Sequence, residues 1–338
     1  MADEKTVLHV GPVDTRGGMA TVIRILCENP PEGWRTDTLA THTEGSIVSK
    51  FLYWRKARRQ LIDRLKQDSP DLVHIHTASD YSWWRKRRVA LICNKANVPV
   101  IMHIHSGRFL KFCEEKSGKD VKKICQMKNL SVVTLSQSWH ENLKQWIGES
   151  MIIHNPVDLS LKMDNVERKK NQILFMGRDS PSKNIALVID IIEMARKSNP
   201  ELQLFIGGIS ADSPLAKMHS DKEWFFPLGW VDDEKKQKLL NESTMLLIPS
   251  EVECQPMVVL EALASGLPVI GSQAVAETLS EAGLILPSLD LQLWSESLLK
   301  MLENKKLEEF SKAGLELSKS YSIEVIQSRW GIQYSKAI

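Results

Sequence analysis

Two carboxylates eight residues apart, Glu253 and Glu261, belong to a segment whose parts have different physical characters. Residues 245–248 form a short apolar run that predicts a buried strand, and a polar loop follows it. Residues 257–264 have helical periodicity, and Gly266 marks the end of that helix. A carboxylate accepts two hydroxyl hydrogen bonds at once, so each of the two suits a vicinal diol. An ordinary helix start, with acidic side chains near its positive end, is the competing interpretation.

Two cations surround a glycine turn in the same half of the chain. Gly177 and Arg178 follow a strand predicted for residues 172–176, and Lys183 precedes a helix that we expect to begin at Asn184. Cations beside a helix N-terminus bind phosphate oxygens well, so this arrangement predicts a diphosphate clamp. A solvated charged loop would have the same composition.

A glycine pair lies near the N-terminus, between a strand predicted for residues 6–10 and a helix predicted for residues 19–27. Gly17 and Gly18 allow the backbone to approach a ligand closely, although a plain tight turn needs them equally. The chain has neither the Gly-x-Gly-x-x-Gly fingerprint nor a phosphate-binding P-loop. Dinucleotide and ATP binding are therefore poor interpretations.

Two predicted strands, residues 72–76 and 98–105, carry histidines at alternate positions. Packing explains most histidines in strands, and this holds for His74, His76 and His103. His105 differs because it ends its strand, just before Ser106 and Gly107. A strand end is where an α/β sheet binds its ligands, so His105 is the histidine that we expect to be functional.

The Glu-x7-Glu spacing with its strand-loop-helix context resembles the retaining GT-B glycosyltransferases, in particular glycosyltransferase family 4. The resemblance implies that Glu253 contacts the donor sugar, that Glu261 contacts the ribose, and that backbone amides between them approach the diphosphate. The loop departs from the commoner Glu-Gly-Phe-Gly pattern of the family. Because Pro256 has no N–H, the amide contacts are expected from Met257 and Val258.

The same resemblance assigns roles to the other motifs. It implies that Arg178 and Lys183 hold the donor phosphates, and that His105 lies near the reacting sugar. Gly17 and Gly18 would face the donor phosphates and the acceptor. The nucleobase would lie beside residues 228–231, which end at Val231. The residues expected to carry the reaction are His105, Glu253, Arg178 and Lys183.

Strands and helices alternate on both sides of Asn155-Pro156, a dipeptide that interrupts regular structure. This pattern predicts an α/β protein with two doubly wound, Rossmann-like domains facing a cleft, which is the GT-B fold of the resembling family. We expect an acceptor-side domain over residues 1–155 and a donor-binding domain over 156–321. The last helix, residues 322–338, is expected to cross back to the first domain, as it does in GT-B proteins.

The composition bounds the function classes. No apolar run reaches the ~18 residues that span a bilayer, the charged N-terminus does not resemble a signal peptide, and five cysteines show no paired or metal-like spacing. A cytoplasmic protein is expected. Residues 1–150 hold 24 Lys and Arg against 16 Asp and Glu, a net charge of +8, which leaves −6 for the rest. A basic half indicates an anionic partner, and the chain has no recognised nucleic-acid motif.

Two stretches combine aromatic and basic residues, 51–59 and 81–88. Trp and Tyr favour the membrane interface and Lys and Arg contact lipid headgroups, so the stretches predict peripheral docking on an anionic membrane. A surface helix with its apolar side on the core is an equal alternative.

The sequence thus predicts a retaining glycosyltransferase that moves a sugar from a UDP- or GDP-linked donor to a lipid-linked or glycan acceptor. The resemblance implies no cofactor and no metal, and no acidic metal cluster is evident. A sugar-nucleotide epimerase on the same fold, a non-catalytic sugar-nucleotide sensor and a basic nucleic-acid adaptor remain as alternatives.

Overall fold

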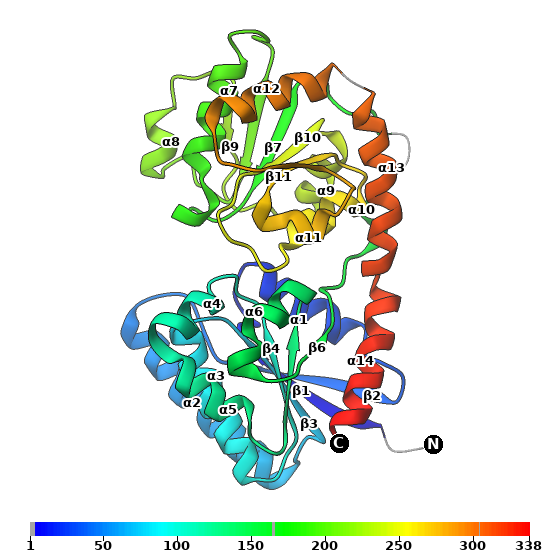
Figure 1. Cartoon of the computed structure of the whole chain (residues 1–338). Helices are drawn as coiled ribbons and strands as arrows, with labels where there is room; N and C mark the ends of the chain where they lie inside the picture. The colour runs from blue at the N-terminus through cyan, green and yellow to red at the C-terminus, as the bar shows by residue number, and fades with distance from the viewer. Residues whose placement is uncertain (1–3, 164–165, 304) are drawn as a thin grey trace. The chain divides into compact units, whose positions relative to one another are not determined.

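The computed structural model describes residues 4–163, 166–303 and 305–338 of the chain (Figure 1). The chain forms two compact units. Unit 1 contains residues Met1–Pro156 and Ile323–Ile338, and unit 2 contains Val157–Ser322. The division falls within the Asn155-Pro156 segment and again just before the last helix.

Unit 1 is built on a six-stranded parallel sheet with the strand order β2-β1-β3-β4-β5-β6. Its elements, in chain order, are β1 (Lys5–Gly11), α1 (Gly18–Glu28), β2 (Trp34–Ala40), α2 (Ile47–Gln67), β3 (Leu72–Thr77), α3 (Tyr81–Lys95), β4 (Val100–Ile104), α4 (Phe109–Phe112), a π-helical turn (Cys113–Ser117), α5 (Gly118–Cys125), β5 (Leu130–Thr134), α6 (Gln137–Ile147), β6 (Met151–Ile152) and α14 (Ile323–Ala337).

The central strands β3 and β4 of unit 1 are continuous buried runs, as expected of a parallel sheet with helices on both faces. Local signals begin the helices: the Ser46 and Ser136 side chains each accept a hydrogen bond from the N–H three residues later, which caps α2 and α6. The last helix of the chain, α14, packs on the first strands, where Tyr334 contacts the Trp34 ring and Gln327 donates to the Pro30 carbonyl. In Figure 1 the red α14 lies beside the blue β2.

Unit 2 has its own six-stranded parallel sheet, with the order β12-β11-β10-β7-β8-β9. Its elements are a 3₁₀ turn (Leu159–Leu161), β7 (Gln172–Met176), a 3₁₀ turn (Pro181–Lys183), α7 (Ile185–Ala195), β8 (Gln203–Gly207), α8 (Pro214–Met218), β9 (Phe225–Pro227), α9 (Asp233–Glu242), β10 (Met245–Ile248), α10 (Met257–Ala264), β11 (Val269–Ser272), a 3₁₀ turn (Gln273–Val275), α11 (Ala276–Leu279), β12 (Leu284–Leu286), α12 (Leu291–Leu302), α13 (Lys306–Ser318) and a 3₁₀ turn (Lys319–Tyr321).

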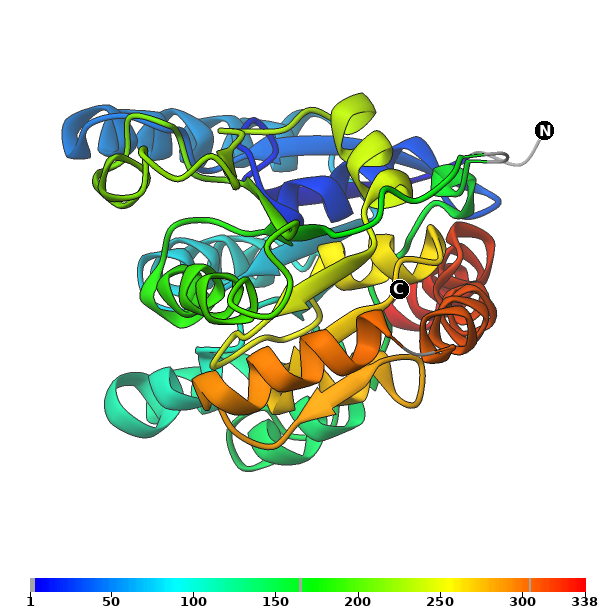
Figure 2. The same cartoon turned by 90° about the horizontal axis from the view of Figure 1, so that it is seen from above.

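The core of unit 2 is apolar on both faces of its sheet. On one face α7 packs against α12, where Ser295 donates to the Ile191 carbonyl (Figures 1 and 2). On the other face α10 packs against α13, and Gly314 lets the two helices approach because a Cβ there would lie 3.1 Å from the Leu263 side chain. The two units together form the two-sheet α/β architecture of the GT-B fold that the sequence predicts.

Candidate functional site

The strand order of unit 2 reverses between β7 and β10, since the chain winds outward from β7 in one direction and from β10 in the other. Open α/β sheets bind ligands at such a switch point, beside the carboxyl ends of the two strands. The loop after β7 contains Arg178 and Lys183, and the loop after β10 contains Glu253. The topology therefore places both predicted constellations at the same edge of one sheet.

Hydrogen bonds tie these two loops together. The Glu251 N–H donates to the Ser182 carbonyl over 2.9 Å, and the Asn184 amide donates to the Pro249 carbonyl over 2.9 Å. Asn184 adopts a left-handed backbone with φ of 52°, which turns the chain from the 3₁₀ turn into α7. The loops thus form one structural unit around the switch point.

Within this unit the Lys183 ammonium forms an ion pair with the Glu253 carboxylate. The Glu253 side chain is only 10% exposed and that of Lys183 24%, so the pair is largely shielded from water. A charged hydrogen bond is stronger than a neutral one, and stronger again away from bulk water. A phosphate group arriving here would compete with Glu253 for the same ammonium.

Glu261 forms a second ion pair, with Lys236 of α9. The Lys236 Nζ lies 2.7 Å from Glu261 Oε1 and 3.1 Å from Asp233 Oδ1. Burial lowers the pKa of Lys236, but Glu261 and Asp233 outweigh burial and the net shift is upward. Glu261 lies in the middle of α10 and is 6% exposed, so its carboxylate has a fixed orientation.

The N-terminus of α10 begins beside these carboxylates. Pro256 is its N-cap residue, and the N–H groups of Met257 and Val258 open its first turn. The first N–H groups of a helix have no intrahelical acceptor, and they carry the positive end of the helix dipole. This terminus can therefore receive an anion between Glu253 and Glu261.

The remaining predicted donor residues lie on neighbouring loops of unit 2. Arg178 is exposed at the turn after β7, and Val231 is half-buried before α9. Gly208 has φ of 105°, and a Cβ there would come within 2.1 Å of the Gly177 carbonyl oxygen. Only glycine allows this approach, and the Gly208 N–H donates to Gly229 over 2.7 Å. The β8 turn thus supports the Gly177-Arg178 turn.

In unit 1 the strand order reverses between β1 and β3. The loop after β1 ends at Gly17, the N-cap residue of α1, with φ of 130°. Gly18 is the first residue of the helix and is exposed. Tyr53 of α2 donates to Asp14 over 2.8 Å and so anchors this loop. The glycine pair therefore lies at the switch point of its sheet, where a ligand is expected.

His105 directly follows β4 and is half-buried, and its Nε2 lies 3.0 Å from His76 Nδ1. It belongs to a cluster of five histidine rings on one face of the unit 1 sheet. Burial lowers the pKa of His105 to about 3 and that of His9 to about 3, and lowers the pKa of the other three well below the ordinary value. All five imidazoles are therefore neutral at pH 7.

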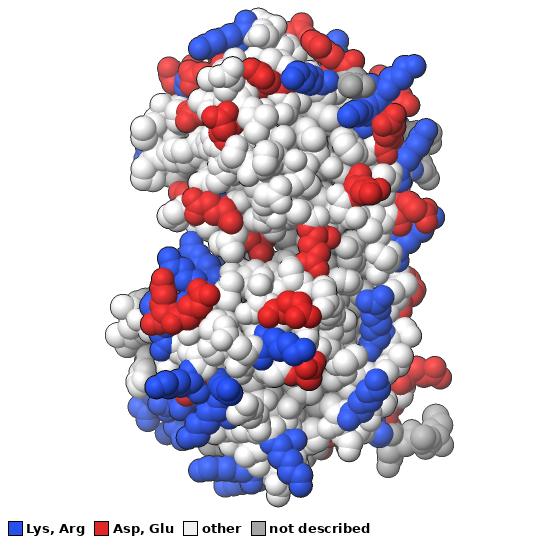
Figure 3. Space-filling model, viewed as in Figure 1, with Lys and Arg blue, Asp and Glu red and all other residues white. Residues whose placement is uncertain are grey.

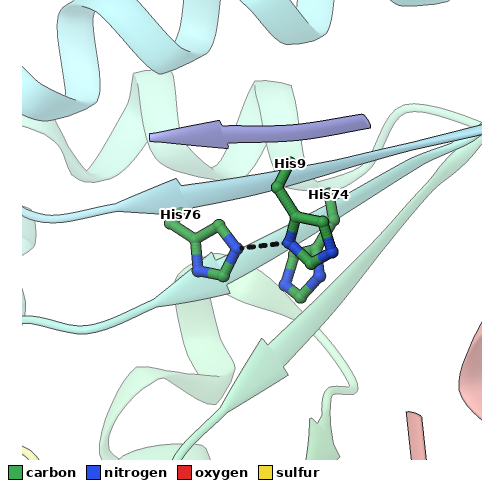
Figure 4. Close-up of side chains that lie close together, drawn as sticks. All are labelled: His9, His74 and His76. Carbon is green, nitrogen blue, oxygen red and sulfur yellow. Dashed lines mark hydrogen bonds between the residues drawn. The ribbon is translucent and has the colours of Figure 1, made fainter. Parts of the chain in front are cut away.

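Neutral imidazoles are also metal ligands. The ring nitrogens of His9, His74 and His76 lie within 4.8 Å of one another, and the same is true of His76, His103 and His105 (Figure 4). These groups are the ones in unit 1 that could hold a cation, although no carboxylate is among them.

The first aromatic-basic stretch is largely solvent-exposed. Four apolar side chains in the first turns of α2 are 87%, 67%, 58% and 56% exposed, namely Ile47, Val48, Phe51 and Leu52. An open pocket of about 540 Å³ adjoins them, lined by Phe51, Trp54, Arg55, Arg58, Arg59, Ile62 and Arg88. Figure 3 shows Lys and Arg gathered on the part of the surface that unit 1 contributes. None of the described helices is both long and apolar enough to cross a bilayer.

The second stretch, residues 81–88, differs from the surface patch that the sequence predicts. Lys86 is 1% exposed and donates to the Thr41 hydroxyl over 2.5 Å, and Trp83 is fully buried. Arg87 forms an ion pair with Asp120 over 2.7 Å. The prediction that all four basic residues of this stretch face a membrane is therefore wrong for Lys86. The periodicity of α3 turns Lys86 toward the core, together with Trp83 and Val89.

Two features escaped the sequence analysis. Lys236 is one of several lysines on a polar helix, and nothing in the sequence indicates that it pairs with Glu261. The sequence contained a signal for His9 that we did not use. His9 lies on β1, and His74 and His76 lie on β3, the strand that pairs with β1. Parallel register then places His9 opposite His74.

Comparison with known families gives two matches. Residues 17–161 match the model "Glycosyltransferase Family 4", and residues 160–316 match "Glycosyl transferases group 1". The first match lies almost wholly in unit 1 and the second in unit 2.

Two proteins with similar sequences each match most of this chain. An uncharacterized 41.2 kDa protein in the cps region of Klebsiella pneumoniae is 25% identical over 305 residues, which cover 80% of this chain and 81% of that one. The phosphatidyl-myo-inositol mannosyltransferase of Mycobacterium tuberculosis is 26% identical over 307 residues, covering 83% and 78%.

Two solved structures have the same fold. Anabaena HepE in complex with UDP and glucose matches with a TM-score of 0.75 and 14% identity, covering 97% of this chain and 99% of that one. The sucrose-phosphate synthase of Thermosynechococcus elongatus matches with a TM-score of 0.79 and 18% identity, covering 98% of each chain.

Proposed function

The chain is a hexosyltransferase of the GT-B, family 4 type, and from this premise we propose that it transfers a sugar from a nucleotide diphosphate donor with retention of configuration. The observation that carries the proposal is the convergence at the β7/β10 switch point. There one loop supplies Lys183 and the other supplies Glu253 beside the N-terminus of α10. A cation, a carboxylate and free amides are the groups that a sugar diphosphate needs.

In this proposal the donor diphosphate binds Lys183, Arg178 and the amides of Met257 and Val258. The chemistry is electrostatic, because these groups stabilise the charge that develops on the leaving diphosphate. Glu253 accepts hydrogen bonds from the donor sugar, and Glu261 accepts them from the ribose. Val231 adjoins the nucleobase. The proposed reaction uses no metal and no other cofactor.

UDP- or GDP-linked sugars are the proposed donors. The support is indirect: HepE has been solved with UDP and glucose and with UDP-glucose, and it shares the fold of this chain. His105 of unit 1 is proposed to act on turnover. Its ring is neutral at pH 7, so it offers a hydrogen bond rather than a charge.

The proposed acceptor is lipid-linked, and unit 1 is proposed to dock on an anionic membrane surface from the cytoplasmic side. The exposed apolar turns of α2 adjoin the arginine-lined pocket. Burial of apolar side chains and electrostatic attraction to anionic lipids both hold an interfacial helix on a membrane, and this surface offers both. Each Lys or Arg near an anionic surface contributes about 1 kcal/mol. A soluble glycan acceptor is the alternative.

A single assay separates the functions. The protein is incubated with UDP- and GDP-sugars, with and without a lipid extract, and free nucleoside diphosphate and the sugar products are measured. Release that depends on the extract, with a labelled lipid product of retained anomeric configuration, supports the transferase. Conversion of the donor sugar without an acceptor indicates an epimerase, and binding without either product indicates a sensor.

Two glutamate variants test the assigned roles. Glu261→Gln should weaken binding of free UDP or GDP, because the ribose loses its acceptor. Glu253→Gln should lower turnover by about 100-fold yet leave free-nucleotide affinity equal or tighter, because Lys183 no longer pairs with a carboxylate. Equal loss of nucleotide affinity in both variants would contradict the division of roles.

Vesicle sedimentation tests the docking. Binding to vesicles that contain anionic phosphatidylglycerol should weaken as salt rises, and the double variant Phe51→Ser/Leu52→Ser should weaken it at every salt concentration. Arg24→Gln is the control, since Arg24 lies on α1 and has a carboxylate partner in Glu28 at 3.6 Å. Protein that stays in the supernatant at low salt rules out this route and favours a soluble acceptor.

A further inference from the structure

Four of the five clustered histidines have no part in the proposed reaction. His9 lies on β1, His74 and His76 on β3, and His103 on β4, and each of the four is 0% exposed. They share one face of the unit 1 sheet with His105. The register places His9 opposite His74 and His76 opposite His103. The rings stack diagonally across the three strands, His9 on His76 and His74 on His103. Helix α14 covers the cluster through Trp330 and Tyr334.

The hydrogen bonds divide the cluster into two separate chains. In the first chain, His9 Nδ1 lies 3.0 Å from His76 Nε2, and His76 Nδ1 lies 3.0 Å from His105 Nε2. Figure 4 shows the first of these bonds. In the second chain, the Tyr334 hydroxyl lies 2.9 Å from His74 Nδ1, and His74 Nε2 lies 3.2 Å from His103 Nδ1.

Counting protons gives the first chain two arrangements. A neutral imidazole carries one N–H, and each nitrogen-nitrogen bond needs one proton. If His9 donates from Nδ1, then His76 also donates from Nδ1, and the Nδ1 of His105 keeps its proton. If the chain runs the other way, His105 donates from Nε2, and His9 carries its proton on Nε2.

The far end of the chain decides between the two arrangements. His9 Nε2 is buried and has no hydrogen-bond partner among the described residues. An orphaned buried N–H is rare in folded proteins, whereas an unused acceptor is tolerated more often. The arrangement with a bare Nε2 on His9 is therefore favoured, and it requires a proton on Nδ1 of His105.

We propose that His76, oriented by His9, is a positioning residue that locks His105 in the Nδ1–H tautomer, so that His105 offers a hydrogen-bond donor to the reacting sugar. This inference rests on the proposed role of His105 in turnover. This series of hydrogen bonds ends inside the protein at His9, so it cannot carry a proton onward. It fixes the direction of the hydrogen bonds and does not conduct protons.

The second chain supplies an internal contrast. If Tyr334 donates to His74 Nδ1, then His74 donates from Nε2 and His103 keeps its proton on Nε2. Either direction leaves one orphaned donor, the Nε2–H of His103 in this direction or the O–H of Tyr334 in the reverse one. The reverse direction also leaves Nε2 of His103 as an unused acceptor, so this direction is favoured. Neighbouring chains on one sheet face are therefore expected to hold opposite tautomers.

A bound transition metal is the rival explanation of the cluster. Zinc would lie about 2.0–2.1 Å from each imidazole nitrogen, and it would replace the hydrogen bonds of His76. Burial and the neighbouring imidazoles account for the lowered pKa values of His74, His76 and His103, and no carboxylate contributes to them. The ring nitrogens that link both chains already have hydrogen-bond partners at 2.9–3.2 Å without an ion, so the hydrogen-bonded chains are favoured.

Nitrogen NMR of the full chain, labelled with ¹⁵N-histidine, tests the lock, because protonated and bare ring nitrogens resonate at well-separated shifts. In the unmodified chain His105 should show one tautomer, protonated on Nδ1, and His103 the opposite one. His76→Gln should convert His105 to a mixture and lower kcat about tenfold with little change in the KM of the donor. His9→Gln provides a second variant that should loosen the same tautomer.

His103→Gln is the matched control, because it removes a ring that packs on His105, with 4.0 Å between the ring centroids, but removes no hydrogen bond of the first chain. It should leave the His105 tautomer unchanged. A proton on Nε2 of His105 in the unmodified chain, or equal effects of the His76 and His103 variants, would overturn the lock. So would stoichiometric zinc in the purified protein whose removal shifts the His76 resonances. These spectra need no acceptor, so failure of the lock is distinguishable from failure of the proposed transferase activity.

Discussion

The two sheets of this protein have the same number of parallel strands, but their titratable side chains lie in different places. The sheet of unit 1 buries four imidazoles and half-buries a fifth, that of His105, and the amine of Lys86 is buried in the same unit. The sheet of unit 2 has an apolar core, and Lys183, Glu253 and Glu261 of the candidate site lie on loops and a helix face, where each forms an ion pair.

The difference teaches that titratable groups can serve two separate purposes. In unit 2 the carboxylates of Glu253 and Glu261 each lie beside an ammonium group, that of Lys183 or Lys236. In unit 1 the imidazoles lose their charge through burial, and hydrogen-bond direction then becomes their useful property. Acid, point substitutions and ligands should therefore affect the two units differently.

The largest expected effect is acid unfolding that begins in unit 1. The folded-state pKa values of the five clustered histidines lie below the ordinary value of 6.5, at about 3 for His9 and His105. Below about pH 6.5 the unfolded chain binds protons that the folded chain does not, so stability is full above that pH and falls as the pH falls. Each histidine contributes about 1.4 kcal/mol per pH unit.

Hydrogen exchange at pH 7.5, 6.5 and 5.5, with rates corrected for intrinsic chemistry, measures this effect peptide by peptide. Protection should decrease in peptides of β1, β3 and β4 before it decreases in peptides of β7 and β10. His9→Gln removes one titrating group and should reduce the pH slope by one proton. Equal loss of protection in both units would show that the imidazoles do not control acid stability.

The next effect concerns the ion pair in unit 2. Lys183→Ala should weaken binding of UDP and GDP about tenfold or more, because a charged hydrogen bond contributes about 1.5–3 kcal/mol. Lys222→Ala is the matched control, since Lys222 also pairs with a glutamate, Glu193 at 2.6 Å, on another part of the same unit. Calorimetric titration measures both. Unchanged affinity in the Lys183 variant would show that the diphosphate does not bind at this loop.

The smallest effect concerns Lys86. Burial, together with the nearby Arg85, lowers the pKa of its amine to about 7. Lys86→Met should leave the free energy of unfolding unchanged at pH 7 or raise it by about 1–2 kcal/mol, since a buried amine loses water without gaining a carboxylate. Thr41 keeps its hydrogen bond to the Gly11 carbonyl. Vesicle binding should not change.

Arg88→Gln is the counterpart, because Arg88 is exposed and lines the pocket of α2. It should weaken vesicle binding without altering stability, as urea unfolding at pH 7 can show. If Lys86→Met weakens vesicle binding as much as Arg88→Gln does, the side chain of Lys86 must reach the surface in solution, contrary to its burial here.

Hydrophobic periodicity and capping residues in the sequence were sufficient to predict most strands and helices, because these signals act within a few residues. β7 and α10 begin and end at the predicted residues. The two predicted donor loops also follow from local signals, since each leaves a strand end. Strand β2 was missed although it has seven residues, because polar and exposed residues interrupt its apolar positions. The short strands β6, β9 and β12 were missed because two or three residues carry no periodicity.

The sequence by itself thus determined the alternation of strands and helices, the glycine turns and the types of residue in the site. Only the tertiary structure decided which charges meet. Lys236 of α9 pairs with Glu261 of α10, 25 residues further along the chain. Helix α3 turns Lys86 inward because Trp83 and Val89 fill the core on the same side. The histidine chains likewise depend on the parallel register of β1, β3 and β4, which pairs residues about 30 or more positions apart. No local pattern encodes such long-range pairings.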